Sequence, residues 1–116
     1  MIDIHFTLMT VRMTDTEYIT QKITAELDLL ERHILMLRVT KENQPIGIIR
    51  LSEILKMPKH KVRYSLRLLE QAGLIEPSME GAKVTDGYDV FMKETSEYLD
   101  SMAERIANVR NAVPKV

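Results

Sequence analysis

The sequence predicts a mainly α-helical fold that carries one small β-hairpin and has a long helix towards each end. Three observations lead to this prediction. Apolar residues recur at spacings of three and four over long stretches near both ends of the chain, as they do along one face of a helix. Two shorter helical patterns meet at Met57 and Pro58. Two short extended segments then surround a turn at residues 78–81.

Length and composition limit the class of protein. At 116 residues the chain fits one compact domain, or a small domain with a dimerisation arm. Its composition is ordinary for a globular protein and no apolar run is long enough to cross a membrane, so we expect a soluble, cytoplasmic protein with no membrane partner. The absence of cysteine excludes disulfides, thiol nucleophiles and cysteine zinc sites, and it suits a reducing cytoplasm.

Residues 1–14 leave two interpretations open. Ile2, Ile4 and Phe6 alternate with other residues, which permits a short strand, and the segment equally fits a loose N-terminal extension. It lacks the basic start and the long apolar core of a signal peptide.

A long first helix is expected to begin at Thr14 or Asp15, because a side-chain oxygen there can accept the free amide protons of the first turn. The helix ends before Pro45, which disfavours helical backbone at Gln44. Its apolar face is expected to consist of Ile19, Ile23, Leu27, Leu30, Ile34 and Leu37.

The middle of the chain predicts two short helices joined by a turn. Residues 46–51 are rich in β-branched side chains, which suits a brief strand or an extended lead-in to Ser52. Ser52 is the expected cap of the first short helix, and Pro58 suits the start of the second, over about residues 59–72. The inward stripe of the second helix is expected to contain Val62, Leu66 and Leu69.

A β-hairpin and a final helix complete the prediction. Gly73 stands where the left-handed end of the preceding helix is needed, and residues 74–77 and 82–85 form two short strands around a turn closed by Gly81. The final helix begins near Thr85 or Asp86 and carries apolar residues at alternating spacings of three and four, which is typical of a coiled-coil seam. The seam contains Met92, Thr95, Leu99, Met102, Ile106, Val109 and Val113.

This seam predicts a partner helix. We expect Met92, Thr95, Leu99, Met102, Ile106 and Val109 to form the dimerisation surface of a homodimer. The alternative is that the final helix packs along the long first helix of its own chain, and the two arrangements are compatible with each other.

Positive charge is concentrated around the second short helix. Residues 56–69 hold five of the 16 Lys and Arg residues, together with His60, and no Asp or Glu. The rest of the chain has 11 basic residues against 17 acidic ones, so the basic character is local. A basic helix face favours nucleic-acid binding, because neutralised phosphates release their counterions.

The order of these elements resembles the winged helix-turn-helix transcriptional regulators of bacteria and archaea, in the group that includes the MarR-like and ArsR-like proteins. The resemblance covers about residues 31–99. It rests on LSEIL at residues 51–55, on Val62 and Leu66 followed by LEQAGLI at residues 69–75, and on VTDG at residues 84–87. The chain departs from the MarR-like pattern in its short length and very small wing.

The resemblance implies both a domain organisation and a function. Taken together with the residue patterns outside the matched part, it leads us to expect three segments. These are an N-terminal extension or short strand over residues 1–14, a winged helix-turn-helix domain over residues 15–85 and a C-terminal dimerisation helix over residues 86–116. The implied function is sequence-specific regulation of transcription by a homodimer that places its recognition helix, residues 59–72, in the major groove of double-stranded DNA.

Carried over by position, the residues at and after the start of the recognition helix are expected to reach base edges and phosphates. They are Lys59, His60, Lys61, Arg63, Tyr64 and Arg67. Arg offers a two-pronged donor to guanine, whereas Lys and Tyr suit phosphates. Lys56, beside this helix, and Lys83, on the hairpin, are further candidates for contacts with the DNA backbone, although a solvated hairpin turn fits Lys83 equally well.

Two other functions remain open from the sequence. Winged helices also serve as protein-interaction modules, and the last helix would then pair with a different protein. A ligand-responsive sensor with a methionine-lined pocket is the second alternative, although no feature of the sequence identifies an effector. We expect no enzyme activity, cofactor or metal site, because the chain shows no phosphate-binding loop, no catalytic triad and no histidine with carboxylates at ligand spacing.

Overall fold

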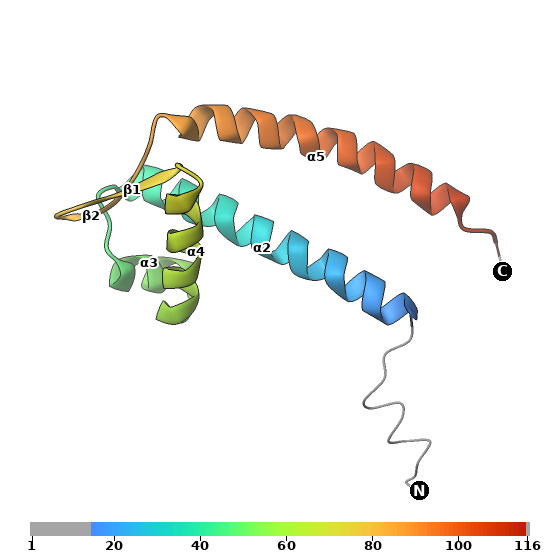
Figure 1. Cartoon of the computed structure of the whole chain (residues 1–116), viewed down its shortest axis with the longest axis horizontal. Coiled ribbons are helices and arrows are strands. Elements are labelled where there is room, and N and C mark those ends of the chain that lie inside the picture. Colours follow the sequence, from blue (N-terminus) through green and yellow to red (C-terminus); the bar gives the residue numbers. More distant parts are fainter. Residues whose placement is uncertain (1–14, 116) are drawn as a thin grey trace, which may run out of the picture. The chain divides into compact units, whose positions relative to one another are not determined.

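The computed structural model describes residues 15–115, with side chains from Glu17 onward. In chain order the elements are α2 (Asp15–Asn43), α3 (Ile48–Leu55), α4 (Lys59–Gln71), β1 (Ile75–Ser78), β2 (Gly81–Val84) and α5 (Gly87–Ala112) (Figure 1). The expected mainly helical fold with one small antiparallel hairpin is confirmed. The strand or extension expected over residues 1–14, and Thr14 as a helix cap, lie outside the described residues.

The chain divides into two compact units, Met1–His33 and Ile34–Val116. In the first unit the structure describes residues 15–33, which form the N-terminal part of α2. The helix ends at Asn43, in the second unit. Four apolar side chains of this part are at least half exposed: Tyr18, Ile19, Ile23 and Leu27. The expected apolar face of the first helix is therefore present but largely open in the first unit.

One hydrophobic core lies in the second unit and draws buried side chains from every element of it except α5, which contributes partly buried ones. The core consists of Met36, Leu37, Ile46, Leu51, Val62, Leu66, Leu69, Leu74, Ile75 and Ala82. The expected inward stripe of α4 is confirmed, since its three residues are at most 7% exposed. Its spacing of four and three residues turns one face of α4 to the core and leaves the opposite face to solvent.

The start of α3 differs from the prediction. Residues 46–51 are expected to be extended, but α3 begins at Ile48, with Gly47 at its N-cap position. The physical reason is helical periodicity, because Ile48, Leu51 and Leu55 share one face and all three pack in or against the core. Burial of this face outweighs the β preference of the branched side chains.

Ser52 is not the N-cap that the sequence predicts. It lies in the middle of α3, and its hydroxyl donates a hydrogen bond to the carbonyl of Met57, beyond the C-terminal end of the helix. The amide of Met57 in turn donates to the carbonyl of Ser52 at 3.1 Å. Ser52 thus holds the turn between α3 and α4, in which Lys56 adopts a left-handed conformation with φ 55°.

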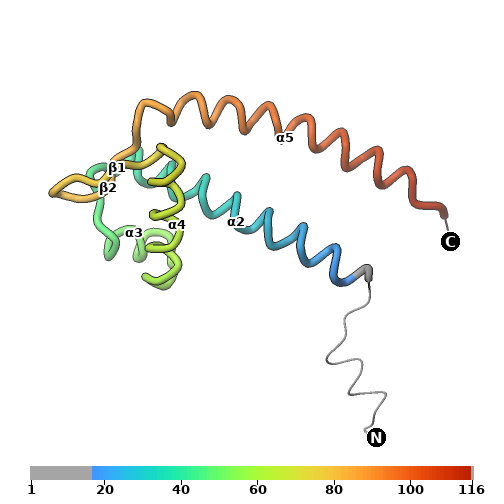
Figure 2. The backbone as a smooth tube through the Cα atoms, viewed as in Figure 1, coloured from blue at the N-terminus to red at the C-terminus, as the bar shows by residue number. Residues whose placement is uncertain are grey.

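The hairpin is tied to the loop between α2 and α3 (Figure 2). Ile46 and Ala82 form an antiparallel bridge with two hydrogen bonds, of 3.1 and 2.7 Å. The side-chain oxygen of Gln44 accepts a further bond of 2.8 Å from the amide of Val84. Gly81 allows this close approach, because a Cβ there would lie 2.6 Å from the backbone of Ile46.

α5 packs against the core through its first two turns, at Tyr88, Phe91 and Met92. The hydroxyl of Thr85 holds the start of this helix, accepting a bond of 3.2 Å from the amide of Gly87 and donating one to the carbonyl of Gly73. Further along the seam the side chains are more open, and three of them are more than half exposed: Ile106, Val109 and Val113.

We predict that Leu51→Ala lowers the free energy of unfolding by about 2–5 kcal/mol, because it leaves a cavity in the core. Leu51 is fully buried, whereas Ile49 on the same helix is 61% exposed. Ile49→Ala is therefore the matched control, with a change of about 0.5 kcal/mol or less. Urea denaturation followed by circular dichroism measures both, and equal losses would contradict the orientation of α3.

Two glycines are expected to respond to substitution with opposite signs. Gly81→Ala should destabilise the protein by about 2 kcal/mol or more, since Gly81 has φ 136° and its Cβ would meet the backbone of Ile46. Gly47→Ser should stabilise it by about 0.5–1 kcal/mol, because Gly47 is extended, has free space around it and lies at an N-cap position. Thermal unfolding of both variants tests the assignment, and a stable Gly81→Ala protein would contradict it.

Stability is expected to fall as the solution becomes mildly acidic. Partial burial, together with the nearby charge of Arg32, lowers the pKa of His33 below its usual value of 6.5. The unfolded chain therefore binds this proton first as the pH falls. The contribution of neutral His33 to the free energy of unfolding is complete above the unfolded-state pKa. It is lost as the pH falls from there through the folded-state pKa.

The variant His33→Gln should remove this part of the pH dependence, because its side chain does not titrate. The measurement is the free energy of unfolding in urea between about pH 7.5 and 5.5, a range that spans the usual pKa of histidine. Identical pH profiles for the two proteins would show that His33 titrates alike in both states.

Candidate functional site

The outward face of α4 gathers polar and cationic side chains. The helix buries four residues, Val62, Ser65, Leu66 and Leu69. At about 100° per residue, His60, Arg63, Tyr64 and Arg67 point within about 70° of the direction opposite the mean of these four. Lys59 and Lys61 flank this group on its two sides. All six side chains are exposed, and they are the six candidates for DNA contact that the sequence predicts on this helix.

The cationic side chains of this face have little neutralising negative charge close to them. Within residues 17–115, no carboxylate lies within 4.0 Å of the charged groups of Lys59, Lys61, Arg63 or Arg67. Their N–H donors consequently remain available to an anionic ligand. From Lys59 to Arg67 the helix rises about 12 Å, at 1.5 Å per residue, and the major groove of B-form DNA is about as wide.

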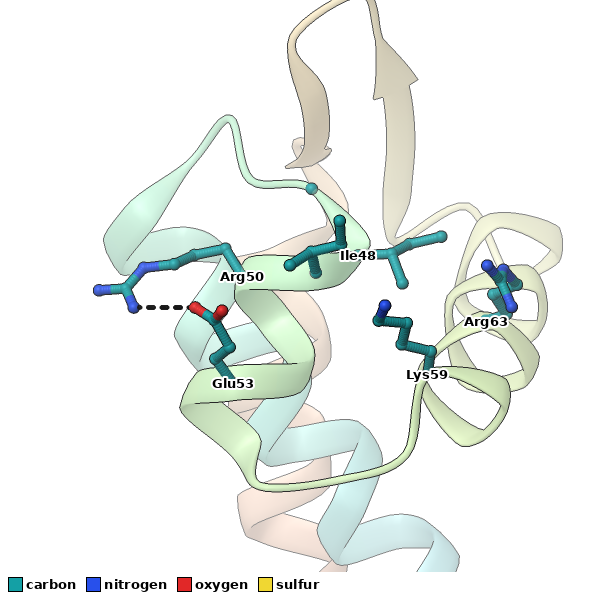
Figure 3. Close-up of a pocket in the computed structure, with 7 residues that line it drawn as sticks. Ile48, Arg50, Glu53, Lys59 and Arg63 are labelled. Carbon is teal, nitrogen blue, oxygen red and sulfur yellow. Dashed lines mark ion pairs between the residues drawn. The ribbon is translucent and has the colours of Figure 1, made fainter.

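A shallow hollow lies between the start of α3 and the start of α4 (Figure 3). It is lined by Gly47, Ile48, Ile49, Arg50, Glu53, Lys59 and Arg63. Arg50 pairs with Glu53 across 3.5 Å on one side of it, whereas Lys59 and Arg63 come from α4. Both members of the ion pair are about 60% exposed or more, so the pair adds little stability.

The N-terminus of α3 is a feature of this region that the sequence analysis missed. Gly47 has no side chain to accept the free amide protons of the first helical turn, and the positive end of the helix dipole therefore faces the hollow. The helical spacing of Ile48, Leu51 and Leu55 is the signal in the sequence that would have revealed this start. The early start also brings Arg50 to the side of the hollow opposite the cations of α4 (Figure 3).

Lys56 and Lys83, the two candidates outside α4, are both exposed. Lys56 occupies the C-cap of α3, in the turn that leads directly into α4. Lys83 lies on β2, where Glu76 is its direct partner in the strand register, and this opposite charge reduces the positive potential of the hairpin. The two lysines therefore differ in their electrostatic surroundings.

The tip of the hairpin is fixed by Ser78. Its hydroxyl donates a bond of 2.7 Å to the carbonyl of Gly81 and accepts one of 3.3 Å from the amide of Glu80. Met79 at the tip is fully exposed, a second feature that the sequence analysis did not anticipate.

In the described part of the chain, no group of three His, Asp or Glu side chains is placed to hold a metal ion. Over the same residues, every helix is too short or too polar to span a lipid bilayer.

No family model and no curated protein matches the chain.

Proposed function

We propose that this protein is a winged helix-turn-helix regulator of transcription that binds double-stranded DNA as a homodimer. The observation that carries the proposal is the exposed face of α4, which presents cationic donors with no acidic partner among the described residues. α3 and α4 form the helix-turn-helix pair, and the β1–β2 hairpin is the wing. In this arrangement α4 is the recognition helix and lies in the major groove.

The residues on α4 divide into two roles by their direction. His60, Arg63, Tyr64 and Arg67 point most directly away from the core, so they face the base edges when the helix lies in the groove. Lys59 and Lys61 flank them and face the phosphates on the two sides of the groove. Lys56 lies in the turn before α4 and adds a further phosphate contact.

Homodimerisation is the second part of the proposal. The seam of α5 contains exposed apolar side chains that a single copy leaves open to water. Pairing of two copies through this helix brings two recognition helices to the same duplex. Each copy then occupies one half of a pseudo-palindromic site, which raises both affinity and specificity.

The principal rival is a protein-interaction module of the same fold. The exposed apolar residues of α5 favour this candidate as well, because they suit a helix of another protein. The two candidates differ in what they require of α4. Its cationic face is essential to a DNA-binding protein and has no role in pairing through α5.

We predict that Arg63→Ala/Arg67→Ala weakens binding to a preferred duplex at least tenfold, on the basis of about 1–3 kcal/mol for each arginine contact with a base. Lys59→Ala/Lys61→Ala should instead weaken binding to all duplexes alike and reduce the slope of log affinity against log salt by about 1–2. Fluorescence anisotropy across a salt series measures both effects, with a duplex selected from a random library and its scrambled counterpart.

Lys93→Ala/Lys115→Ala is the matched control, since it removes two exposed cations from the α5 region and leaves α4 intact. It should bind DNA much as the unmodified protein does. If the folded protein binds neither duplex at low salt, DNA binding is excluded and the protein-interaction module becomes the better proposal.

A further inference from the structure

The seam of α5 contains information about the direction in which two copies pair. In heptad notation Met92, Leu99 and Ile106 occupy a positions, whereas Thr95, Met102 and Val109 occupy d positions. The residues that flank such a seam, at e and g, determine which orientation of the partner is favourable. Phe91, at a g position, packs against the core of its own chain. The other flanking residues with charged or aromatic side chains are Asp89, Tyr98, Arg105 and Arg110.

We propose that α5 pairs with α5 of a second copy in an antiparallel arrangement whose two-fold axis passes between Leu99 and Met102. The inference rests on the homodimer in the proposed function and specifies its interface. In this register Leu99 of each copy faces Met102 of the other, and Thr95 faces Ile106. The contact is isologous, as a closed dimer requires.

Charge complementarity supports this register. An antiparallel pair places e residues opposite e residues and g residues opposite g residues. Asp89 of one copy then faces Arg110 of the other, twice by symmetry, and both side chains are exposed and free to pair. Tyr98 faces Arg105 of the other copy, which places a guanidinium beside an aromatic ring that is 58% exposed.

The parallel arrangement is disfavoured by the same residues. A parallel pair brings each g residue to the e residue five positions further along the other chain. Arg105 would then face Arg110 of the second copy on both sides of the seam, so like charges would meet. Antiparallel registers displaced by one heptad are also poorer, because they separate Asp89 from Arg110.

The arrangement has a geometric consequence for DNA binding. Each α5 helix begins at Gly87, 13.5 residues before the two-fold axis. The two starting points therefore lie 27 residues apart along the helix pair. At 1.5 Å per residue this separation is about 40 Å. Successive major grooves on one face of DNA lie about 34–36 Å apart. The pair of α5 helices therefore has the length needed to hold two recognition helices near adjacent half-sites.

Charge-reversal variants test the orientation without DNA. In the antiparallel dimer, Asp89→Arg and Arg110→Asp each replace two attractive pairs by two repulsive ones, so each variant alone should dimerise about tenfold more weakly. An equimolar mixture of the two variants restores both pairs in the heterodimer and should recover the affinity to within about threefold. Sedimentation equilibrium measures all three samples.

Two controls change the charge of α5 by the same amount away from the seam. Glu97→Arg matches the first variant and Lys93→Asp matches the second, and both positions are exposed and outside the contact. They should dimerise as the unmodified protein does. Circular dichroism verifies that each variant retains its helices.

The two orientations give Arg110→Asp opposite effects. In a parallel dimer it would relieve the contact with Arg105 and tighten association, and that result would overturn the proposal. A protein that stays monomeric, or a mixture that fails to recover affinity, would also overturn it. DNA binding is measured separately through the α4 variants. A dimer of the other orientation therefore overturns only this inference, whereas a monomer also removes the homodimer from the proposed function and leaves DNA binding by α4 to be judged by the anisotropy data.

Discussion

Burial of one face of α4 is the constraint from which the proposed interface follows. Val62, Leu66 and Leu69 are almost fully buried and Ser65 is fully buried, so the rotation of the helix about its axis is fixed by the core. A different rotation would expose these side chains and bury cations without partners, at a high cost in free energy. The direction of every cationic side chain on α4 is therefore a consequence of apolar packing on the opposite side.

The same core also fixes the surroundings of α4. Leu51 anchors α3, and Ser52 closes the turn that leads from α3 into α4. The bridge between Ile46 and Ala82 joins the hairpin to the loop before α3, with Gly81 allowing the close approach. The hollow beside α4 thus depends on contacts that are local in space although they connect distant parts of the sequence.

α5 follows a different principle. Its first turns belong to the core of the second unit, whereas much of its later apolar seam is exposed. An exposed apolar seam with ordered flanking charges is suited to a symmetric helix partner, since charge placement at e and g positions selects orientation as well as partner. In the proposed dimer the chain thus uses one face of α4 for the nucleic acid and one face of α5 for a second copy.

The sequence alone predicted the helices, the hairpin, the buried stripe of α4 and the cationic composition of its other face, because helical periodicity and glycine or proline signals are local properties. It did not predict the start of α3. The β-branched residues near Ile48 favour an extended chain locally, and only the burial of Leu51 together with its helical neighbours reverses that preference. That Gly47, Arg50 and Lys59 line one hollow was likewise decided by tertiary packing, since it depends on how two helices meet across a shared core.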